Sequence, residues 1–488
     1  MNRFHTSIFG ILSASACGCS STTAFEKPTP LNNSQLVSPR VNKAEINEID
    51  RAVNPIKPTS YLESKPAPSN TSKSFDTQHP FPDSELSVEE LVRVVQQRNP
   101  TLEQMTAVAT AIAARYPQVT SLDDPMIGFQ TAPFSVGSPN ANYAARVELT
   151  QKIPLFGKRE LRGQVVLAEV HAAIQDIDDA RLQLTESARS AFADYYLAEK
   201  SLAVASENLK LLGEFRQNAE TRYRNGLAPQ QDMLQADVEL ARLEERLVSI
   251  RRARQVAQAK INTLAHLPTD GALPPPAECR PSGTLSEPSE LRARALASRP
   301  DVKAISDRLA AETAALCLAQ REYKPDVELL TAYDGFWQGD GGRPLQWQIG
   351  ARVNLPIRTS RRDGAVSEAN AKIAQRRAEL ARLTDQIGLQ VQEAYEQIVE
   401  SIQTLKLYET KALPAAEANV KEAQTAYVNG KVPFLSLVEA QRSVITVKDR
   451  LNETRAELVR RRATLDRVVG EAGTTGIASV VSRSWRYF

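Results

Sequence analysis

The sequence predicts a mainly helical protein with four β-strands that lie in a membrane. Three observations lead to this prediction: the chain repeats itself once, each copy contains a pair of strands with alternating polarity, and a very long helical stretch follows each pair. Four strands cannot close a membrane barrel, because the smallest known barrels need about eight. We therefore expect a trimer whose twelve strands close a β-barrel, continued by a long α-helical coiled-coil barrel.

The N-terminal segment predicts export. Residues 1–16 resemble a secretory signal peptide, since a short apolar run is followed by Ala14-Ser15-Ala16, the form of a cleavage site. Cleavage there would leave Cys17 first in the mature chain, either carrying a lipid anchor or unmodified. Residues 17–85 are rich in Pro, Ser, Asn, Thr and Lys without an apolar period, which predicts a disordered tail.

The internal duplication divides the remaining chain into residues 86–285, residues 286–470 and a C-terminal tail over 471–488. Segments 221–229 and 425–433 share Thr, Tyr, Asn, Gly and Pro at equal places. Each copy predicts a helix, a β-hairpin, a long helix and a second helix. In the first copy the opening helix is expected over residues 87–116, because Ser87-Val88-Glu89-Glu90 forms a capping box.

The strand pairs are predicted from a polarity period of two. Most odd positions of residues 143–153 and 345–355 are apolar, and the even positions are mainly polar. Partner strands are expected near 127–129 and 327–337, joined by hairpin loops at 137–140 and 339–342. Strands of about 10 residues match the length that a tilted strand needs to cross a bilayer.

The helical stretches are long enough to form a tunnel. Residues 158–224 and 361–428 would each span roughly 100 Å as continuous helices. The helices after the turns, 230–266 and from 434 onward, carry apolar residues about every seven positions, which predicts coiled-coil packing. Arg254 and Arg461 interrupt these seams. The turns themselves are expected at Asn225-Gly226 and Asn429-Gly430, because glycine adopts the left-handed conformation at low cost.

Composition and motifs argue against other functions. The net charge of +2 provides no bulk attraction to nucleic acid. No P-loop, nucleophile elbow or paired-carboxylate pattern occurs, and the four histidines are scattered, so we expect no enzyme, no cofactor and no stationary metal site. Cys279 and Cys317 lie in different predicted elements; two free thiols are favoured, and a disulfide is the alternative.

Over about residues 86–470 the chain resembles the TolC family of outer-membrane efflux factors. The resemblance rests on the duplicated strand pairs, on Pro154 and Pro356 at the strand-to-helix swivel, and on the two Asn-Gly tips with a small residue, Ala236 or Ala440, in the following seam. The segment from Ile153 to Arg159 resembles the cobalt-zinc-cadmium branch of that family.

The resemblance implies a gate at the tips. In relatives a Tyr and an Asp hold the tip closed, and Tyr427 and Asp232 match them, whereas Val432 replaces an expected Arg and Lys431 is the candidate substitute. Glu439 matches one member of an acidic pore ring, and Ser436 replaces the other. The simpler interpretations are helix capping for Asp232, core packing for Tyr427 and a solvated charge for Glu439.

The resemblance also implies a function. We expect a homotrimeric passive channel in the bacterial outer membrane that contacts outer-membrane lipid and extends into the periplasm. It would export small molecules or metal ions, with a periplasmic adaptor docked at Asn225, Gly226, Asn429 and Gly430 and an inner-membrane efflux pump behind it. The alternative is a periplasmic adaptor or structural coiled coil. Such proteins lack two alternating strand pairs with aromatic residues at their ends, here Tyr143, Tyr333, Trp337 and Trp347.

Overall fold

The computed structural model describes residues 81, 85–131, 133, 145–278, 285–335 and 347–471. All of these belong to one compact unit, Glu63–Ile477. Several expectations fall outside the described residues: the signal peptide 1–16, Cys17, almost all of the 17–85 tail, both hairpin loops, Cys279 and the chain beyond residue 471.

The two halves of the chain repeat the same broad order of elements. The first half contains helices, a strand pair and two long helices: α2 (Val88–Arg98), α3 (Pro100–Ala113), α4 (Arg115–Thr120), β1 (Met126–Thr131), β2 (Ala145–Ile153), α5 (Lys158–Arg224) and α6 (Gln230–Leu264). The second half follows with α7 (Pro288–Ser298), α8 (Pro300–Arg321), β3 (Val327–Gly335), β4 (Trp347–Val353), α9 (Thr359–Leu407), the π-helix η2 (Tyr408–Ala412), α10 (Leu413–Val428) and α11 (Phe434–Val469).

The expected single helix over residues 87–116 is wrong, because α2, α3 and α4 replace it. The first break falls at Asn99, whose backbone is extended with φ −70° and ψ 122°. The ring of Pro100 disfavours a helical conformation at the residue before it. The Asn99 side chain then starts α3 by accepting a hydrogen bond from the Thr101 N–H at 3.0 Å.

The two long helices differ, although the sequence predicted continuous helices in both places. Helix α5 runs unbroken for 67 residues, or about 100 Å. The predicted continuous helix over 361–428 is wrong, since the five-residue π-helix η2 separates α9 from α10. Pro414 lies at the start of α10 and has no N–H to donate. A π-helix next to a proline is a recognised place for a helix to bend.

The four strands form one antiparallel sheet in the order β1-β2-β3-β4. The predicted period of two is confirmed, although Leu355 lies beyond the end of β4. Phe129, Val147, Tyr333 and Trp347 are aligned across the sheet, and the rings of the last two lie 5.1 Å apart. The opposite face is polar, with Arg146 bonded to the buried Asp334 at 2.7 Å and Arg352 bonded to Glu148.

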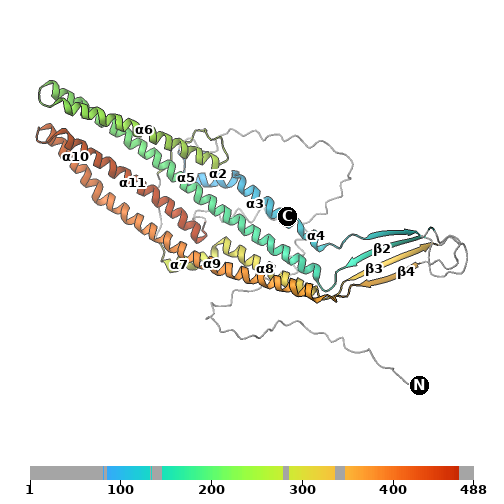
Figure 1. Cartoon of the computed structure of the whole chain (residues 1–488). Coiled ribbons are helices and arrows are strands. Elements are labelled where there is room, and N and C mark those ends of the chain that lie inside the picture. The colour runs from blue at the N-terminus through green and yellow to red at the C-terminus, as the bar shows by residue number, and fades with distance from the viewer. Residues whose placement is uncertain are drawn as a thin grey trace, which may run out of the picture. The chain divides into compact units, whose positions relative to one another are not determined.

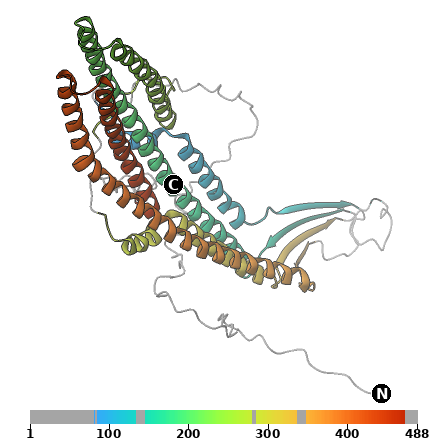
Figure 2. The ribbon, with the colours of Figure 1, turned by 60° about the vertical axis from the view of Figure 1, so that its left-hand side comes forward.

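Helix α5 is the centre of the helical part. It packs against α6, α8 and α11 and also against α2, α3 and α4, whereas α9 packs on α7, α8 and α11. The predicted seven-residue seam of α11 is buried at Leu437, Val444, Leu451, Leu458 and Leu465. Figures 1 and 2 show the sheet at the end where α5 begins, and the α5–α6 and α10–α11 turns at the opposite end of the long helices. Among the described helices, none is both long and apolar enough to cross a membrane.

Candidate functional site

The two predicted turns form the tip of the helical part, and both close in the same way. Gly226 and Gly430 have φ values of +72° and +71°. In the first turn the Leu227 N–H donates to the Arg222 carbonyl at 2.8 Å and the Gly226 N–H donates to the Tyr223 carbonyl at 2.9 Å. This hydrogen-bond pair is the Schellman motif, which needs a left-handed residue after the helix. The second turn repeats it at the corresponding residues.

Tyr427 lies in the apolar core of the tip with only 4% of its surface exposed. Its ring meets the edge of the Phe434 ring at a centroid distance of 5.4 Å. Its hydroxyl donates to a carboxylate oxygen of Asp232 at 3.2 Å, so the structure brings the two predicted gate residues together. Burial, followed by the negative charge of Asp232, raises the pKa of Tyr427 to about 12. The phenol therefore remains a hydrogen-bond donor at neutral pH.

Asp232 also occupies the first turn of α6, where its negative charge interacts favourably with the helix dipole and stabilises the helix. The capping interpretation and the contact with Tyr427 are therefore compatible. The packing interpretation of Tyr427 is compatible with that contact as well, because the ring is in the core while the hydroxyl reaches Asp232.

Arg222 belongs to the first tip motif, but the sequence interpretation gave it no role in the gate. Its guanidinium donates to the carbonyl oxygens of Tyr427 at 3.0 Å and Val428 at 2.7 Å, and lies 4.9 Å from the centre of the Tyr427 ring. Arg222 thus joins the end of α5 to the end of α10. The partners are 205 and 206 residues apart in sequence, so no local spacing pointed to this contact.

Glu439 is not an isolated carboxylate. Arg442, one turn further along α11, donates to it at 2.7 Å. The Glu439 side chain is 56% exposed, in agreement with the simpler interpretation of a solvated charge. Its pairing with Arg442 reduces the local negative charge that the acidic-ring expectation assigned to this position.

The two strand-to-helix junctions at Pro154 and Pro356 have different surroundings. After Pro154 the chain passes through positive φ values at Phe156 and Gly157. Lys158 then buries its ammonium group, which donates to an Asp326 oxygen at 2.8 Å and to the Lys324 carbonyl at 2.9 Å. After Pro356 the side chain of Ile357 is exposed. The buried charge of Lys158 therefore ties the first junction to the segment just before β3.

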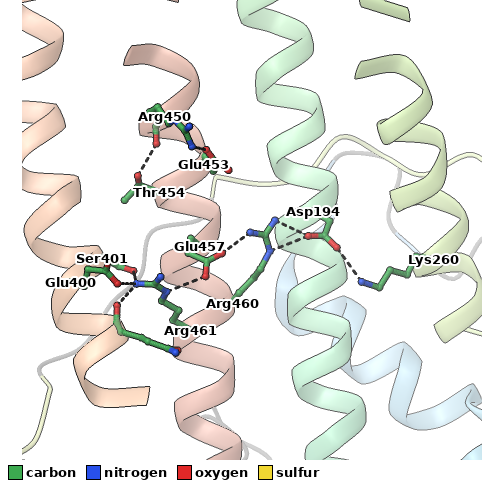
Figure 3. A network of polar contacts seen from close by, with 11 residues as sticks. Asp194, Lys260, Glu400, Ser401, Arg450, Glu453, Thr454, Glu457, Arg460 and Arg461 are labelled. Atoms are coloured by element: carbon green, nitrogen blue, oxygen red, sulfur yellow. Dashed lines mark hydrogen bonds and ion pairs between the residues drawn. The ribbon is translucent and has the colours of Figure 1, made fainter. Parts of the chain in front are cut away.

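A polar network ties four helices together midway along the bundle, as Figure 3 shows. Arg460 of α11 donates to Asp194 of α5 at 2.7 Å, and Lys260 of α6 donates to the same carboxylate at 3.1 Å. Arg461, which the sequence showed only as an interruption of an apolar seam, bonds to Glu457 on its own helix and to Ser401 of α9. Arg254 likewise pairs with Glu199 across α5 and α6. We use the name girdle for six residues of this network, without the Arg254–Glu199 pair: Asp194, Lys260, Ser401, Glu457, Arg460 and Arg461.

Among the described residues, no group of three or more His, Cys, Asp or Glu side chains is placed to hold a metal ion. Cys317 lies exposed on α8 as a free thiol. The candidate site is therefore built from hydrogen bonds and ion pairs between helices at the tip and in the girdle.

Comparison with known proteins identifies the family. The model of the family described as "Outer membrane efflux protein" matches residues 91–265 and 291–471. Nodulation protein T of Rhizobium leguminosarum bv. viciae is 23% identical over 62% of this chain, which spans 64% of that protein's length. The probable efflux pump outer membrane protein SepC of Pseudomonas putida is 25% identical over 65% of this chain and 68% of its own length.

Solved structures share the fold at low sequence identity. The outer-membrane channel OprN superposes with a TM-score of 0.66 at 21% identity, covering 80% of this chain and 94% of its own. The outer membrane protein VceC of Vibrio cholerae also gives 0.66, at 18% identity, covering 79% and 96%. The family match extends over both halves of the chain, including both tips and both strand pairs. The chain belongs to the outer membrane efflux protein family.

Proposed function

We propose that this protein is the passive outer-membrane channel of a tripartite efflux system, acting as a homotrimer. Three copies of the sheet would close a twelve-stranded barrel in the outer membrane. The long helices would continue it as a tunnel of about 100 Å through the periplasm. Transport through such a channel needs no catalytic step.

The observation that carries this proposal is the sheet, whose apolar face points away from the protein's own core. In lipid this face would be buried and the polar face would line the lumen. The outer edges of β1 and β4 would pair with those of neighbouring copies, since unpaired backbone groups are costly in a bilayer. The exposed apolar residues on this face are Ile127, Phe129, Val147, Leu149, Leu329, Tyr333, Trp347, Ile349 and Val353.

The partners and cargo follow from the family. SepC and TtgF of Pseudomonas putida are named as outer membrane proteins of efflux pumps, the latter of a toluene efflux pump. We extend this role to the present chain: it would receive small molecules from an inner-membrane pump through a periplasmic adaptor. The adaptor would dock on the Asn225-Gly226 and Asn429-Gly430 turns, which lie at the end opposite the sheet. A periplasmic adaptor role for this chain itself is disfavoured by the sheet.

The gate would be the contact between Tyr427 and Asp232. The hydroxyl–carboxylate bond joins α10 of the second half to α6 of the first, and Arg222 adds two further bonds from α5. Arg222 would thus contribute the arginine function that Val432 lacks. Separating the two halves at the tip requires breaking all of these bonds, so they favour the closed tip.

Channel formation can be tested with the full chain, first in outer membranes and then after purification. Crosslinking in outer membranes should trap trimers, and those trimers should conduct ions in planar bilayers. A stable, membrane-inserted monomer, or a trimer that never conducts, would contradict the proposal.

The gate can be tested in the same bilayers. Tyr427→Phe and Asp232→Ala should each raise the open fraction, because a shielded bond to a carboxylate contributes about 1.5–3 kcal/mol and less when wet. The double variant should add little, since both changes remove the same hydrogen bond. Tyr223→Phe is the matched control, because Tyr223 has the equal place in the first tip but is 43% exposed. Unchanged opening in both single variants would limit Tyr427 and Asp232 to packing and capping.

A further inference from the structure

From the tip toward the sheet, a direction called upward here, α6 carries polar residues at intervals of seven. Asp232, Glu239 and Arg246 therefore occupy the same position of the coiled-coil repeat. Each contacts a residue from the second half of the chain. From the tip upward the contacts are Asp232 with Tyr427, Glu239 with Arg442, and Arg246 with Asp449.

The two upper contacts are ion pairs between α6 and α11. Glu239 is 9% exposed and accepts a hydrogen bond from the Arg442 Nε at 3.1 Å. It also accepts one from Arg242, on its own helix, at 2.9 Å. One heptad further up, the Arg246 guanidinium pairs with a carboxylate oxygen of Asp449. Arg442 and Asp449 are themselves seven residues apart, so the two ion pairs are separated by one heptad on both helices.

Apolar side chains do not fill the space between α6 and α11 at the level of these ion pairs. A hollow of about 260 Å³ lies between α5, α6 and α11, lined by the residues of the lower ion pair together with apolar side chains such as Leu243 and Val438. The Gln441 side chain crosses to Asn208 of α5 with a hydrogen bond of 2.8 Å, and both residues are buried. Polar contacts therefore add to the apolar contacts of Leu437 and Val438 in connecting α11 to the first half at this level.

The two ion pairs have opposite polarity. Glu239 on α6 faces a positive residue, whereas Arg246 on α6 faces a negative one. A slip of one heptad, about 10 Å along the axis, would place Glu239 opposite Asp449 or Arg246 opposite Arg442. Like charges directly opposed are destabilising, so only the observed register keeps both contacts attractive.

We propose that the Glu239–Arg442 and Arg246–Asp449 pairs form a register lock, which holds the α10–α11 pair against α5–α6 above the tip and keeps the tip closed in one alignment. This inference rests on the proposed channel function. It extends the closing contacts from the tip itself to two further heptads. It also implies that the tip opens by separation of the two helical pairs and not by sliding along the axis.

The test uses charge reversal in full-length trimers recorded in planar bilayers. Asp449→Arg and Arg246→Asp each replace the Arg246–Asp449 ion pair by two like charges, and each should raise the open fraction. We expect about a tenfold rise, since each part-exposed pair changes an equilibrium by roughly two- to threefold and a trimer would hold three. The double variant Arg246→Asp with Asp449→Arg restores an attractive pair and should return the open fraction to within about twofold of wild type.

Glu453→Arg is the matched control. Glu453 lies on α11 four residues after Asp449, but its ion pair is with Arg450 on the same helix. Its reversal should leave the open fraction unchanged. If Asp449→Arg reduces the yield of detergent-resistant trimers, Asp449→Asn replaces it, with an expected rise of a few-fold. A double variant as open as the single variants, or a control as open as Asp449→Arg, would overturn the lock.

The register itself is tested by distance measurement between spin labels at Val248 on α6 and Glu453 on α11, both exposed. In Asp449→Arg the slipped alignment sets Glu239 opposite the introduced arginine, so a second distance population should appear beside the single one of wild type. A single population in both proteins would overturn the register claim. Wild-type trimers that fail to conduct would overturn the proposed channel function, whereas conducting trimers without rescue would overturn the lock alone.

Discussion

The two halves of the chain share their order of elements, yet equivalent residues have opposite surroundings. Tyr223 and Tyr427 have equal places before their turns, but the first is 43% exposed and the second 4%. Lys158 is buried at the first strand-to-helix junction, whereas Ser360 at the equal place in the second is exposed. The duplication therefore preserves the backbone plan, while the contacts of each half are specialised.

The long helices show the same difference. Helix α5 is unbroken and supports most of the helical part, whereas its counterpart is interrupted by η2. The π-helix lies between the girdle, which holds α9 and α11, and the tip, where α10 ends. We infer that the first half is the fixed frame and that α10, with the part of α11 between the tip and the girdle, is the part able to move.

The largest expected effect is at the first junction. Lys158→Met should destabilise the protein by about 3 kcal/mol, because it removes a buried ammonium group and leaves the Asp326 side chain, only 12% exposed, without its cation. Ser360→Ala should change stability by less than about 0.5 kcal/mol, as for most surface substitutions. Thermal dissociation of detergent-resistant trimers measures both. Equal losses would mean that the two junctions are equivalent.

The next effect concerns the continuity of the long helices. Lys210→Pro places a proline in α5 where the second half has Pro414, and should cost about 3 kcal/mol, because an interior proline removes a hydrogen bond and clashes with the preceding turn. Pro414→Ala should instead stabilise the second half slightly and lower the open fraction in planar bilayers. A rise in the open fraction of Pro414→Ala would show that η2 is not a hinge for opening.

The sequence predicted the elements that depend on local pattern. The period of two defined both strand pairs, and the heptads identified the buried residues of α11. The break at Asn99 was missed although Pro100 supplied a local signal for it. The break at η2 had a weaker signal, Pro414, because a proline can be accommodated within a bent helix.

The candidate site was predictable only in part. Tyr427 and Asp232 were identified through the family resemblance, and the structure places them in contact. Arg222, Arg442 and the girdle were given no role, because most of their partners lie on other helices, 60 or more residues away in sequence. An exposed charge and an interhelical ion pair look the same in one sequence, since both fall on the polar side of a coiled-coil repeat.

The expected loss of stability from substitutions in the two turns is intermediate. Gly226→Ala and Gly430→Ala should each cost about 1 kcal/mol, because both glycines have the same left-handed backbone. Larger side chains should have different effects at the two positions. A Cβ at residue 430 would lie 3.8 Å from the Arg222 guanidinium, whereas one at 226 meets nothing within 4 Å.

Gly430→Val should therefore displace Arg222 and raise the open fraction, while Gly226→Val should impair efflux in cells only through adaptor docking. Gly430→Pro should also abolish efflux without dissociating the trimer, since proline cannot adopt a positive φ. Wild-type efflux in all of these variants would remove the docking role of the turns.

The smallest expected effect is a pH dependence of the girdle. Burial opposes ionisation of Glu457, but the hydrogen bonds from Arg460 and Arg461 outweigh it and lower the pKa of Glu457 below its ordinary 4.5. A carboxylate with a lowered pKa contributes stability that is present above the ordinary value and is lost as the pH falls through the folded value. The contribution should stay under about 1 kcal/mol, since the side chain is 39% exposed.

Asp466, on the same helix, acts in the opposite direction. Burial raises its pKa, despite the opposing charges of Arg189 and Arg462. Its protonation during acidification therefore favours the folded state and offsets part of the loss at Glu457. Glu457→Gln should remove the first contribution and leave the second, so the fall in trimer melting temperature as the pH drops below about 4.5 should be smaller than in wild type. Alanine stands at the equal place in the first half, Ala253, so no first-half residue should substitute for Glu457 in this response. Parallel pH curves for the variant and wild type would show that the girdle stabilises the bundle without the charge of Glu457.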